Sequence, residues 1–237
     1  MSKIEEKGLK KSEVTRRDFL KLSGTVTVGL GIAGFTNLLW TKDGHAAIAV
    51  SGGYLLVDVK KCQGCLTCML TCALAHEGEA SLSKARLQVV QNSFAAWPGD
   101  LTIEQCRQCV DAPCVEICPV DALVPNPDFG NVRMVDKDLC IGCGLCVDAC
   151  PYTPSRPMVA EDAAYDDDDK SSKCDLCADT PYWNQTGGPG GKQACVEICP
   201  LGAISFTTVV PEQTGDSGYK VNLRDEGWAN LGYSTDD

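Results

Sequence analysis

The sequence predicts a small α+β protein with a duplicated unit, in which short strands and short helices surround groups of cysteines. Its 237 residues include sixteen cysteines, and all of these fall into four runs of four. A Val-Asp pair precedes the first and the third run at the same spacing. The string CVEICPVDAL at residues 114–123 recurs as CVEICPLGAI at residues 195–204. These repeats favour two related modules within one chain.

The N-terminal segment, residues 1–46, is predicted to be a twin-arginine export signal. Residues 15–21 are Thr-Arg-Arg-Asp-Phe-Leu-Lys, and a weakly apolar stretch follows over residues 22–40. Paired arginines of this kind are part of a targeting signal that an export receptor recognises. Cleavage is expected after Ala46 or Ala49, and the protein is expected to reach the periplasm already folded. A membrane anchor is the alternative, because the apolar stretch is about long enough to span a bilayer.

Charge and histidine content exclude several classes of function. The net charge of −11 and the pI of about 4.6 argue against nucleic acid or an anionic membrane as the main partner. His45 and His76 are the only histidines, which leaves little room for His-rich metal sites or a Ser-His-Asp triad. The sequence contains no CxxCH haem motif, phosphate loop or nucleotide-binding fingerprint. The cysteines are therefore the main functional signal.

The four cysteine runs follow one spacing pattern. In run three, two, two and three residues separate successive cysteines and a proline follows, as in bacterial ferredoxins. Run one has the same spacing, whereas the middle gap widens to four residues in run two and to seventeen in run four. The runs consist of Cys62, Cys65, Cys68 and Cys72; Cys106, Cys109, Cys114 and Cys118; Cys140, Cys143, Cys146 and Cys150; and Cys174, Cys177, Cys195 and Cys199.

This spacing suits four [4Fe–4S] clusters. Three thiolates on a tight loop bind one cluster, and the fourth points away toward a second cluster. Gly64, Gly142 and Gly144 give the loops freedom to pass close to inorganic sulfide. Disulfides and zinc sites are the alternatives. Neither explains a single ligand pattern repeated four times, and zinc sites usually separate two CxxC pairs by a longer stretch.

The remaining elements are predicted from short apolar stretches. Strands are expected at residues 54–57, 85–91, 132–135 and 204–208. Helices should be short and begin near the last cysteines of each run. The acidic stretch at residues 166–169 is predicted to be a solvated loop, with a partner-docking patch as the alternative. The segment from residue 207 to residue 237 has no ligand pattern, so we expect either an arm on a partner subunit or a disordered end.

Residues 54–206 resemble the four-cluster iron–sulfur subunits of molybdopterin oxidoreductases. The resemblance rests on the four runs, on the wide gap in run four, and on the strings CRQC at residues 106–109 and KCDLC at residues 173–177. Such subunits accompany dimethyl sulfoxide, polysulfide, thiosulfate and tetrathionate reductases and formate dehydrogenases. Similar subunits accompany tungsten enzymes of the aldehyde-oxidoreductase type. A twin-arginine signal on this subunit itself differs from some relatives, which travel on the catalytic subunit's signal.

The resemblance also implies which cysteines share a cluster. Runs one and four pair, and so do runs two and three; the short separation of 21 residues between Cys118 and Cys140 supports the second pairing. The implied ligand sets are Cys62, Cys65, Cys68 and Cys199; Cys174, Cys177, Cys195 and Cys72; Cys106, Cys109, Cys114 and Cys150; and Cys140, Cys143, Cys146 and Cys118. The implied fold has two bacterial-ferredoxin-like modules with loop insertions. An inner module (101–154) is inserted in an outer one (47–100 plus 155–210), and a C-terminal tail or arm (211–237) follows.

The resemblance implies electron transfer without a catalytic site in this chain. The expected partners are a molybdenum or tungsten pterin catalytic subunit on one side and a membrane quinone module or a cytochrome on the other. Such a partner would also bring the protein to the membrane. A free-standing periplasmic polyferredoxin that acts as a diffusible carrier is the alternative.

Overall fold

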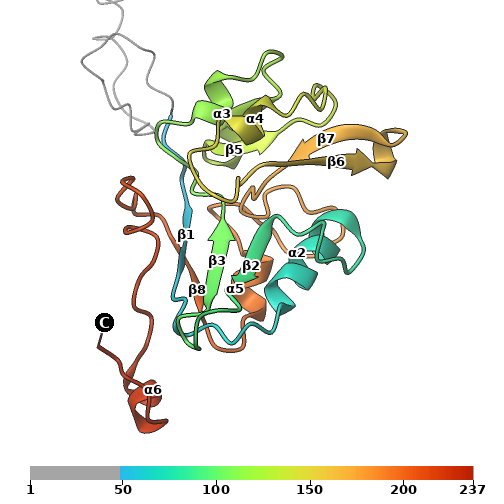
Figure 1. Ribbon diagram of the computed structural model, residues 1–237. Coiled ribbons are helices and arrows are strands. Elements are labelled where there is room, and N and C mark those ends of the chain that lie inside the picture. Colours follow the sequence, from blue (N-terminus) through green and yellow to red (C-terminus); the bar gives the residue numbers. More distant parts are fainter. Residues whose placement is uncertain (1–48, 237) are drawn as a thin grey trace, which may run out of the picture. The chain divides into compact units, whose positions relative to one another are not determined.

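Short helices and four separate two-stranded antiparallel sheets form the described part of the computed structural model (Figure 1). The structure describes residues 49–236, so the predicted export signal lies outside the described residues. The α+β class predicted from the sequence is confirmed. Among the described residues, no helix combines the length and the apolar character that a membrane crossing needs.

The elements follow one another at short intervals. In chain order they are β1 (Tyr54–Val57), α2 (Thr67–Glu77), β2 (Leu87–Gln91), β3 (Leu101–Gln105), α3 (Pro113–Glu116), β4 (Leu123–Asn126), η1 (Pro127–Phe129), β5 (Val132–Val135), α4 (Leu145–Asp148), β6 (Met158–Asp162), η2 (Ala163–Tyr165), β7 (Asp168–Ser172), α5 (Ala194–Ile198), β8 (Ile204–Thr207) and α6 (Glu226–Asn230). Most are only one turn or one short strand long, which fits a chain whose loops carry the cysteines.

The pairing of elements joins distant parts of the sequence. β1 pairs with β8, with Val57 opposite Ile204, whereas β2–β3, β4–β5 and β6–β7 are local pairs. Helix α2 packs against α5, and α3 packs against α4 (Figure 1). The elements of runs one and four are therefore neighbours, and so are those of runs two and three.

Three predicted strands fall where expected, and the helices differ in detail. β1 and β5 have the predicted bounds, β8 ends one residue early, and β2 begins at Leu87 instead of Ala85. The helices begin earlier than predicted, because α3, α4 and α5 contain the third cysteine of a run and end before or next to the fourth. Helix α2 has eleven residues and contains both Cys68 and Cys72.

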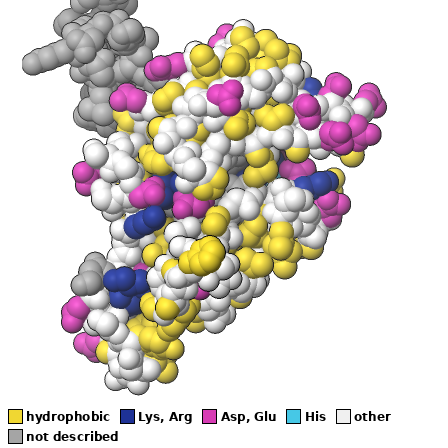
Figure 2. Space-filling model, viewed as in Figure 1, with side chains coloured by type: hydrophobic (Ala, Val, Ile, Leu, Met, Phe, Trp, Pro, Cys, Tyr) yellow, Lys and Arg dark blue, Asp and Glu magenta, His cyan; other side chains and the backbone are white. Residues whose placement is uncertain are grey.

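The acidic stretch at residues 166–169 is exposed but is not simply a loop. Asp166 and Asp167 form the turn of a hairpin with left-handed backbone, and Asp168 and Asp169 begin strand β7. Asp168 and Asp169 pair with Asp162 and Glu161 of β6. Figure 2 shows acidic side chains gathered at the end of this hairpin. The sequence did not predict the hairpin, because no apolar alternation marks its strands.

The main hydrophobic core is small and includes many of the cysteines. Leu55 and Val57 of β1, Ile103 of β3 and Ile204 of β8 are at most 3% exposed. They pack in the same cluster as cysteines of runs one, two and four. The cysteine sites are therefore parts of the core and not attachments to it.

Part of the C-terminal tail packs on the chain itself, in contrast to the two expectations for it. The backbone N–H of Val57 donates to the Tyr219 carbonyl at 2.9 Å, and that of Val221 donates to the Val57 carbonyl at 2.9 Å. Tyr219 is fully buried, and its hydroxyl donates to the Arg107 carbonyl at 2.8 Å. Residues 211–224 therefore connect β1 with the loop of run two.

Candidate metal centres

Three cavities are each lined by four cysteines. In every case three come from one run and the fourth comes from another part of the sequence. We call them the Cys62 quartet (Cys62, Cys65, Cys68, Cys199), the Cys106 quartet (Cys106, Cys109, Cys114, Cys150) and the Cys140 quartet (Cys140, Cys143, Cys146, Cys118). The structure thus brings together three of the ligand sets that the family resemblance implies.

The other four cysteines form a fully buried group, the Cys174 quartet (Cys72, Cys174, Cys177, Cys195). Each is between 4% and 8% exposed. Burial raises the pKa of the Cys195 thiol well above its usual range, and the neighbouring Cys177, Cys174 and Cys72 raise it further. Cys72 lies on α2 and Cys195 on α5, so the packing of these two helices brings the four together.

Left-handed backbone allows the cysteine loops to turn tightly. Gly64 and Gly142 occupy the same place in runs one and three, with φ of +71° and +67°. Leu66 and Gly144 also occupy matching places, each just before a helix, with φ of +60° and +77°. A residue with a Cβ atom is strained in this region of backbone conformation, and glycine is not. Leu66 therefore adopts a strained backbone conformation that Gly144 adopts without strain.

Backbone N–H groups point at the sulfur atoms of all four quartets. The distances from nitrogen to sulfur lie between 3.2 and 3.4 Å. The donor–acceptor pairs are Gly64–Cys62, Arg86–Cys72, Arg156–Cys150, Ser171–Cys140, Ala194–Cys177 and Ala203–Cys199. Such bonds favour a thiolate ligand and tune the potential of a bound cluster. The residues present therefore fit [4Fe–4S] clusters.

Burial controls the protonation of the thiols. It raises the pKa of Cys68, Cys114 and Cys177 to about 12, despite hydrogen bonds or nearby cations that oppose the shift. In contrast, a hydrogen bond from the Thr67 hydroxyl lowers the pKa of Cys65. Metal binding requires thiolates, so loading the buried sites must release protons.

The quartets differ in their exposure to solvent. Cys65 of the Cys62 quartet and Cys143 of the Cys140 quartet are exposed. All members of the Cys174 quartet are buried, and those of the Cys106 quartet are buried or half-buried. Two quartets therefore reach the surface through one cysteine each.

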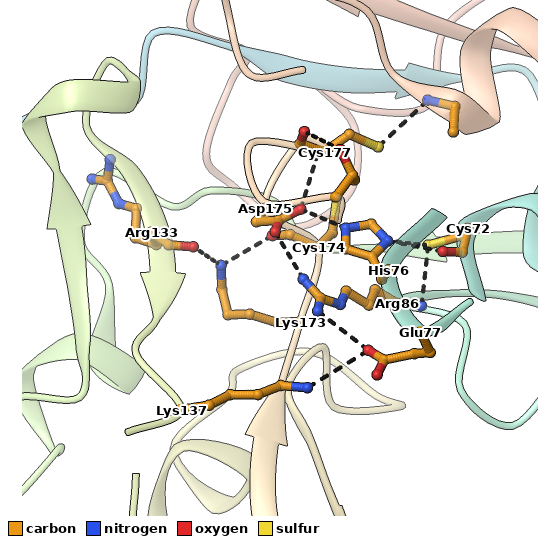
Figure 3. A network of polar contacts seen from close by, with 12 residues as sticks. Cys72, His76, Glu77, Arg86, Arg133, Lys137, Lys173, Cys174, Asp175 and Cys177 are labelled. Carbon is orange, nitrogen blue, oxygen red and sulfur yellow. Dashed lines mark hydrogen bonds and ion pairs between the residues drawn. The ribbon is translucent and has the colours of Figure 1, made fainter. Parts of the chain in front are cut away.

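A buried polar network supports the Cys174 quartet (Figure 3). His76 bonds the carbonyl of Cys72 through Nδ1 at 2.8 Å and a carboxylate oxygen of Asp175 through Nε2 at 3.0 Å. The Arg86 guanidinium donates to the other Asp175 oxygen at 2.7 Å. The backbone N–H of Cys177 also donates to Asp175, at 2.9 Å. The network therefore ties α2 to the loop of run four.

The charges in this network stabilise one another. Burial alone would lower the pKa of His76, but the hydrogen bond and charge of Asp175, together with Cys72, raise it to about 9. Burial would raise the pKa of Asp175, but His76, Arg86 and Lys173 lower it to about 2. The sequence identified His76 only as a remaining histidine; the structure places its ring between the Cys72 carbonyl and the Asp175 carboxylate.

Sequence reasoning missed the basic residues at the Cys106 quartet. Arg107, Arg133, Arg156 and Lys173 line that cavity and are buried. Arg107 and Lys173 belong to the strings CRQC and KCDLC, which served only as family signatures. Their signal was a cation directly beside a cysteine, in a chain whose net charge is strongly negative.

None of the cysteines forms a disulfide, and all sixteen lie within the described part of the chain. Over residues 49–236, no group of three or more Cys, His, Asp or Glu side chains is arranged to hold a single metal ion. Instead, three of the quartets surround a cavity, with one cysteine of each on a different segment of the chain.

Comparisons with known proteins point to one kind of protein. Residues 99–209 match the family model of a 4Fe-4S dicluster domain. The chain is 35% identical to the putative electron transport protein YsaA of Escherichia coli K12, over 66% of this chain and 90% of YsaA. It is 36% identical to the polyferredoxin-like subunit of an aliphatic sulfonate oxidoreductase of Pyrococcus furiosus, over 62% of this chain and 70% of that subunit. It is also 33% identical to the thiosulfate reductase electron transfer subunit PhsB of Salmonella typhi, over 64% of this chain and 73% of PhsB.

Proposed function

Because the chain belongs to the family of electron-transfer iron–sulfur proteins with a 4Fe-4S dicluster domain, we propose that it carries four [4Fe–4S] clusters. The chain is a non-catalytic electron-transfer subunit of an oxidoreductase complex. The observation that carries the proposed number is that each of three cavities is lined by four cysteines, and the remaining four cysteines form one more buried group.

Each quartet would hold one cluster through its four sulfur atoms. When bound, such a cluster accepts and gives up single electrons at a potential that its surroundings set. The backbone N–H groups of the chain stabilise the thiolates, and the apolar walls of the Cys62 and Cys140 cavities keep water away. The chain therefore provides fixed positions and fixed electrostatics, and it needs no general acid or base.

Neighbouring quartets lie close to one another, so clusters bound in them would form a path for electrons. Cys68 raises the pKa of the Cys195 thiol, and Cys106 raises that of the Cys174 thiol, so the Cys174 quartet neighbours two others. The side-chain amide of Gln108 donates to the Cys174 carbonyl at 2.9 Å and accepts from the Arg133 backbone N–H at 2.8 Å. The α3–α4 contact joins the Cys106 and Cys140 quartets. Electrons would enter or leave at the exposed Cys65 and Cys143.

The pairing of elements supports the proposed nested arrangement of two modules. The β1–β8 pair and the α2–α5 contact hold runs one and four together, which are the proposed outer module (47–100 plus 155–210). The β4–β5 pair and the α3–α4 contact hold runs two and three together, which are the proposed inner module (101–154).

The proposed partner is a molybdenum or tungsten pterin catalytic subunit, with a membrane quinone module or a cytochrome at the other end of the path. Relatives named as subunits of a thiosulfate reductase and of a sulfonate oxidoreductase support a catalytic partner. A free-standing carrier is the second candidate. The exposure of cysteines at two separate quartets favours a relay between two partners.

Anaerobic purification of the tagged full chain from its own host tests this function. We expect about sixteen iron atoms and about sixteen acid-labile sulfides per chain, because four complete quartets are present. The chain should co-elute with a large protein that contains molybdenum or tungsten. Zinc in place of iron would exclude the clusters, and elution of the iron-loaded chain alone would favour the free-standing carrier.

We also propose export in the folded state, because of the twin arginines Arg16 and Arg17. Fractionation of the same cells tests whether the protein is exported. Iron-loaded protein should be found in the periplasmic fraction, and recovery of all of it from the cytoplasm would contradict the export signal.

A further inference from the structure

Four buried cations line the cavity of the Cys106 quartet. Arg107 and Arg133 are 1% exposed, Lys173 is 2% exposed and Arg156 is 6% exposed. Of the residues that the structure describes, no charged side chain lines the cavities of the Cys62 and Cys140 quartets. The Cys106 quartet therefore has a charge environment that these two lack.

Only two of these cations have a carboxylate partner. Arg156 pairs with the buried Glu104, and Arg107 pairs with the half-buried Asp216 at 2.5 Å. Within residues 49–236, Arg133 and Lys173 have no carboxylate within ion-pair distance. The charge of Lys173 also helps to lower the pKa of the buried Asp175, although the two form no ion pair. The wall of this cavity still carries more positive than negative charge.

Arg133 and Lys173 are held in place by neutral groups. The Arg133 guanidinium donates to the Asn131 carbonyl at 3.0 Å and to the Val110 carbonyl at 3.4 Å. The Lys173 ammonium donates to the carbonyls of Arg133 and of Cys174 (Figure 3). Because Lys173 also lines the cavity of the Cys106 quartet, it lies between that quartet and the Cys174 quartet. These bonds fix both charges without neutralising them.

Some donors of these side chains also lack an acceptor. Among the described residues, the buried Nε–H groups of Arg107, Arg133 and Arg156 have no hydrogen-bond partner. A buried cation with unmade bonds is costly unless a nearby negative charge compensates it. A cluster with four thiolate ligands in this cavity is such a negative charge. Consistent with this, the charge of Lys173 opposes the rise that burial causes in the pKa of Cys114.

The cations act differently on the two redox states of a bound cluster. Reduction adds one electron, and so one negative charge, to the cavity. Buried charges are screened much less than exposed ones, so nearby cations stabilise the reduced state more than the oxidised state. Among the described residues, the cavities of the Cys62 and Cys140 quartets have no buried cation in their walls. The ammonium of Lys170 donates to the Cys140 carbonyl at 2.8 Å, but Lys170 is half-buried and does not line that cavity, so solvent screens its charge more strongly. At the Cys174 quartet, the Arg86 guanidinium faces two carboxylates, Asp175 at 2.7 Å and Glu77 at 3.3 Å, which compensate its charge.

We propose that the Cys106 quartet holds the cluster with the highest reduction potential of the four, and that Arg133 and Lys173 set this potential. The proposal rests on the proposed function, since it requires clusters at the quartets. The first electron to enter the chain would settle at this cluster. Arg133 and Lys173 act through the fixed positive charge that they hold beside the cluster, and they do not bind iron.

A redox titration of the full chain, followed by electron paramagnetic resonance, tests the proposal. Mediator dyes poised with dithionite supply the electrons. Cys109→Ser should alter the signal that appears at the highest potential, which assigns that signal to the Cys106 quartet. Lys173→Met should lower the equilibrium constant for reduction at this signal about tenfold, or about 59 mV for a one-electron couple. Lys173→Arg keeps the charge and should restore the wild-type potential.

Further variants separate the possible outcomes. Lys84→Met removes an exposed lysine, paired with Glu79 at 2.6 Å, and should shift no signal. If Cys109→Ser alters only a low-potential signal, the proposal is wrong, whether or not Lys173→Met retains its clusters. It is equally wrong if Lys173→Met and Arg133→Met both leave the highest potential unchanged. Iron content distinguishes these results from failure of the proposed function, because in that case the wild-type chain would lack the four clusters.

Discussion

Gly142 and Gly144 flank the exposed Cys143, and they differ in one measurable way. Both have left-handed backbone, with φ of +67° and +77°. A Cβ atom on Gly142 would lie 2.3 Å from the Asp169 carbonyl oxygen of β7, whereas a Cβ atom on Gly144 would meet nothing within 4 Å. Gly142 is therefore required by a close approach as well as by its backbone angle.

Alanine at the two positions should therefore have unequal effects. Gly144→Ala should cost about 1 kcal/mol, which is the cost of a left-handed L-residue. Gly142→Ala should cost on the order of 3 kcal/mol, because the β7 hairpin must also move away from the cysteine loop. The measurement is the guanidinium concentration at which half of the visible cluster absorbance is lost. Equal midpoints for the two variants would show that the hairpin does not constrain this loop.

The cysteines were recognisable from the sequence because ligand spacing is a local property. The four quartets in the structure contain the same cysteines as the four implied ligand sets. That these quartets bind clusters stays a prediction. The buried cations were not recognisable in this way. Arg133 approaches the Cys106 quartet from β5 and Arg156 approaches it from the segment after run three, and no spacing rule connects these positions.

Strands β1 and β5 end in the same way, which reflects the internal repeat. Asp58 follows β1 and Asp136 follows β5, and each carboxylate accepts backbone N–H bonds two and three residues further on. Asp58 has two additional donors, the Leu223 N–H at 3.0 Å and the Arg224 Nε–H at 3.1 Å, and it is only 3% exposed. One copy of this motif thus also anchors the C-terminal tail.

The two aspartates form a matched pair for mutation. Asp58→Ala should cost about 3 kcal/mol, because it leaves part-buried backbone donors and the buried Arg224 guanidinium without this acceptor. Asp136→Ala should cost about 1 kcal/mol, because its donors belong to exposed residues that water can reach. Loss of cluster absorbance in guanidinium again measures the difference. A larger loss for Asp136→Ala would contradict the anchoring role of Asp58.

The strands that the sequence predicted have apolar residues in the core. β1, β5 and β8 contribute Leu55, Val132 and Ile204, all buried. Strands β3 and β4 were not predicted, although they also contribute buried apolar residues, Ile103 and Leu123. The β6–β7 hairpin was missed, because β7 begins with two exposed aspartates and has only one buried position, Ser171. Its strand pairing depends on the turn at residues 166–167 and on contacts with run three, such as the bond from Ser171 N–H to Cys140 sulfur at 3.3 Å. Such tertiary contacts are not visible in a local pattern.

At the scale of the whole molecule, the tail between residues 211 and 224 joins parts that are far apart in sequence. Gln213 accepts from the Val110 N–H at 3.1 Å, Asp216 pairs with Arg107, and Tyr219 bonds to β1. The sequence offered no signal for this role, because the tail has no ligand pattern and its only fully buried side chain is Tyr219.

Two truncations separate the functions of the tail. Ending the chain at Val210 should lower the guanidinium midpoint strongly, because β1 loses a neighbour and Arg107 loses its carboxylate. Ending it at Arg224 should have a smaller effect, because the contacts to β1, Arg107 and Asp58 remain. Iron content and midpoint are measured for both truncated chains. Equal midpoints for these two chains would show that residues 211–224 do not stabilise the fold.

The β1–β8 pair also affects the order in which parts of the fold can form while the chain is being synthesised. All cysteines of the Cys106 and Cys140 quartets have left the ribosome once Cys150 has emerged. The Cys174 and Cys62 quartets must wait for Cys195 and Cys199, and β1 must wait longer still for β8 at Ile204–Thr207. Strand β1 therefore reaches its final place only after nearly all of the polypeptide has been made.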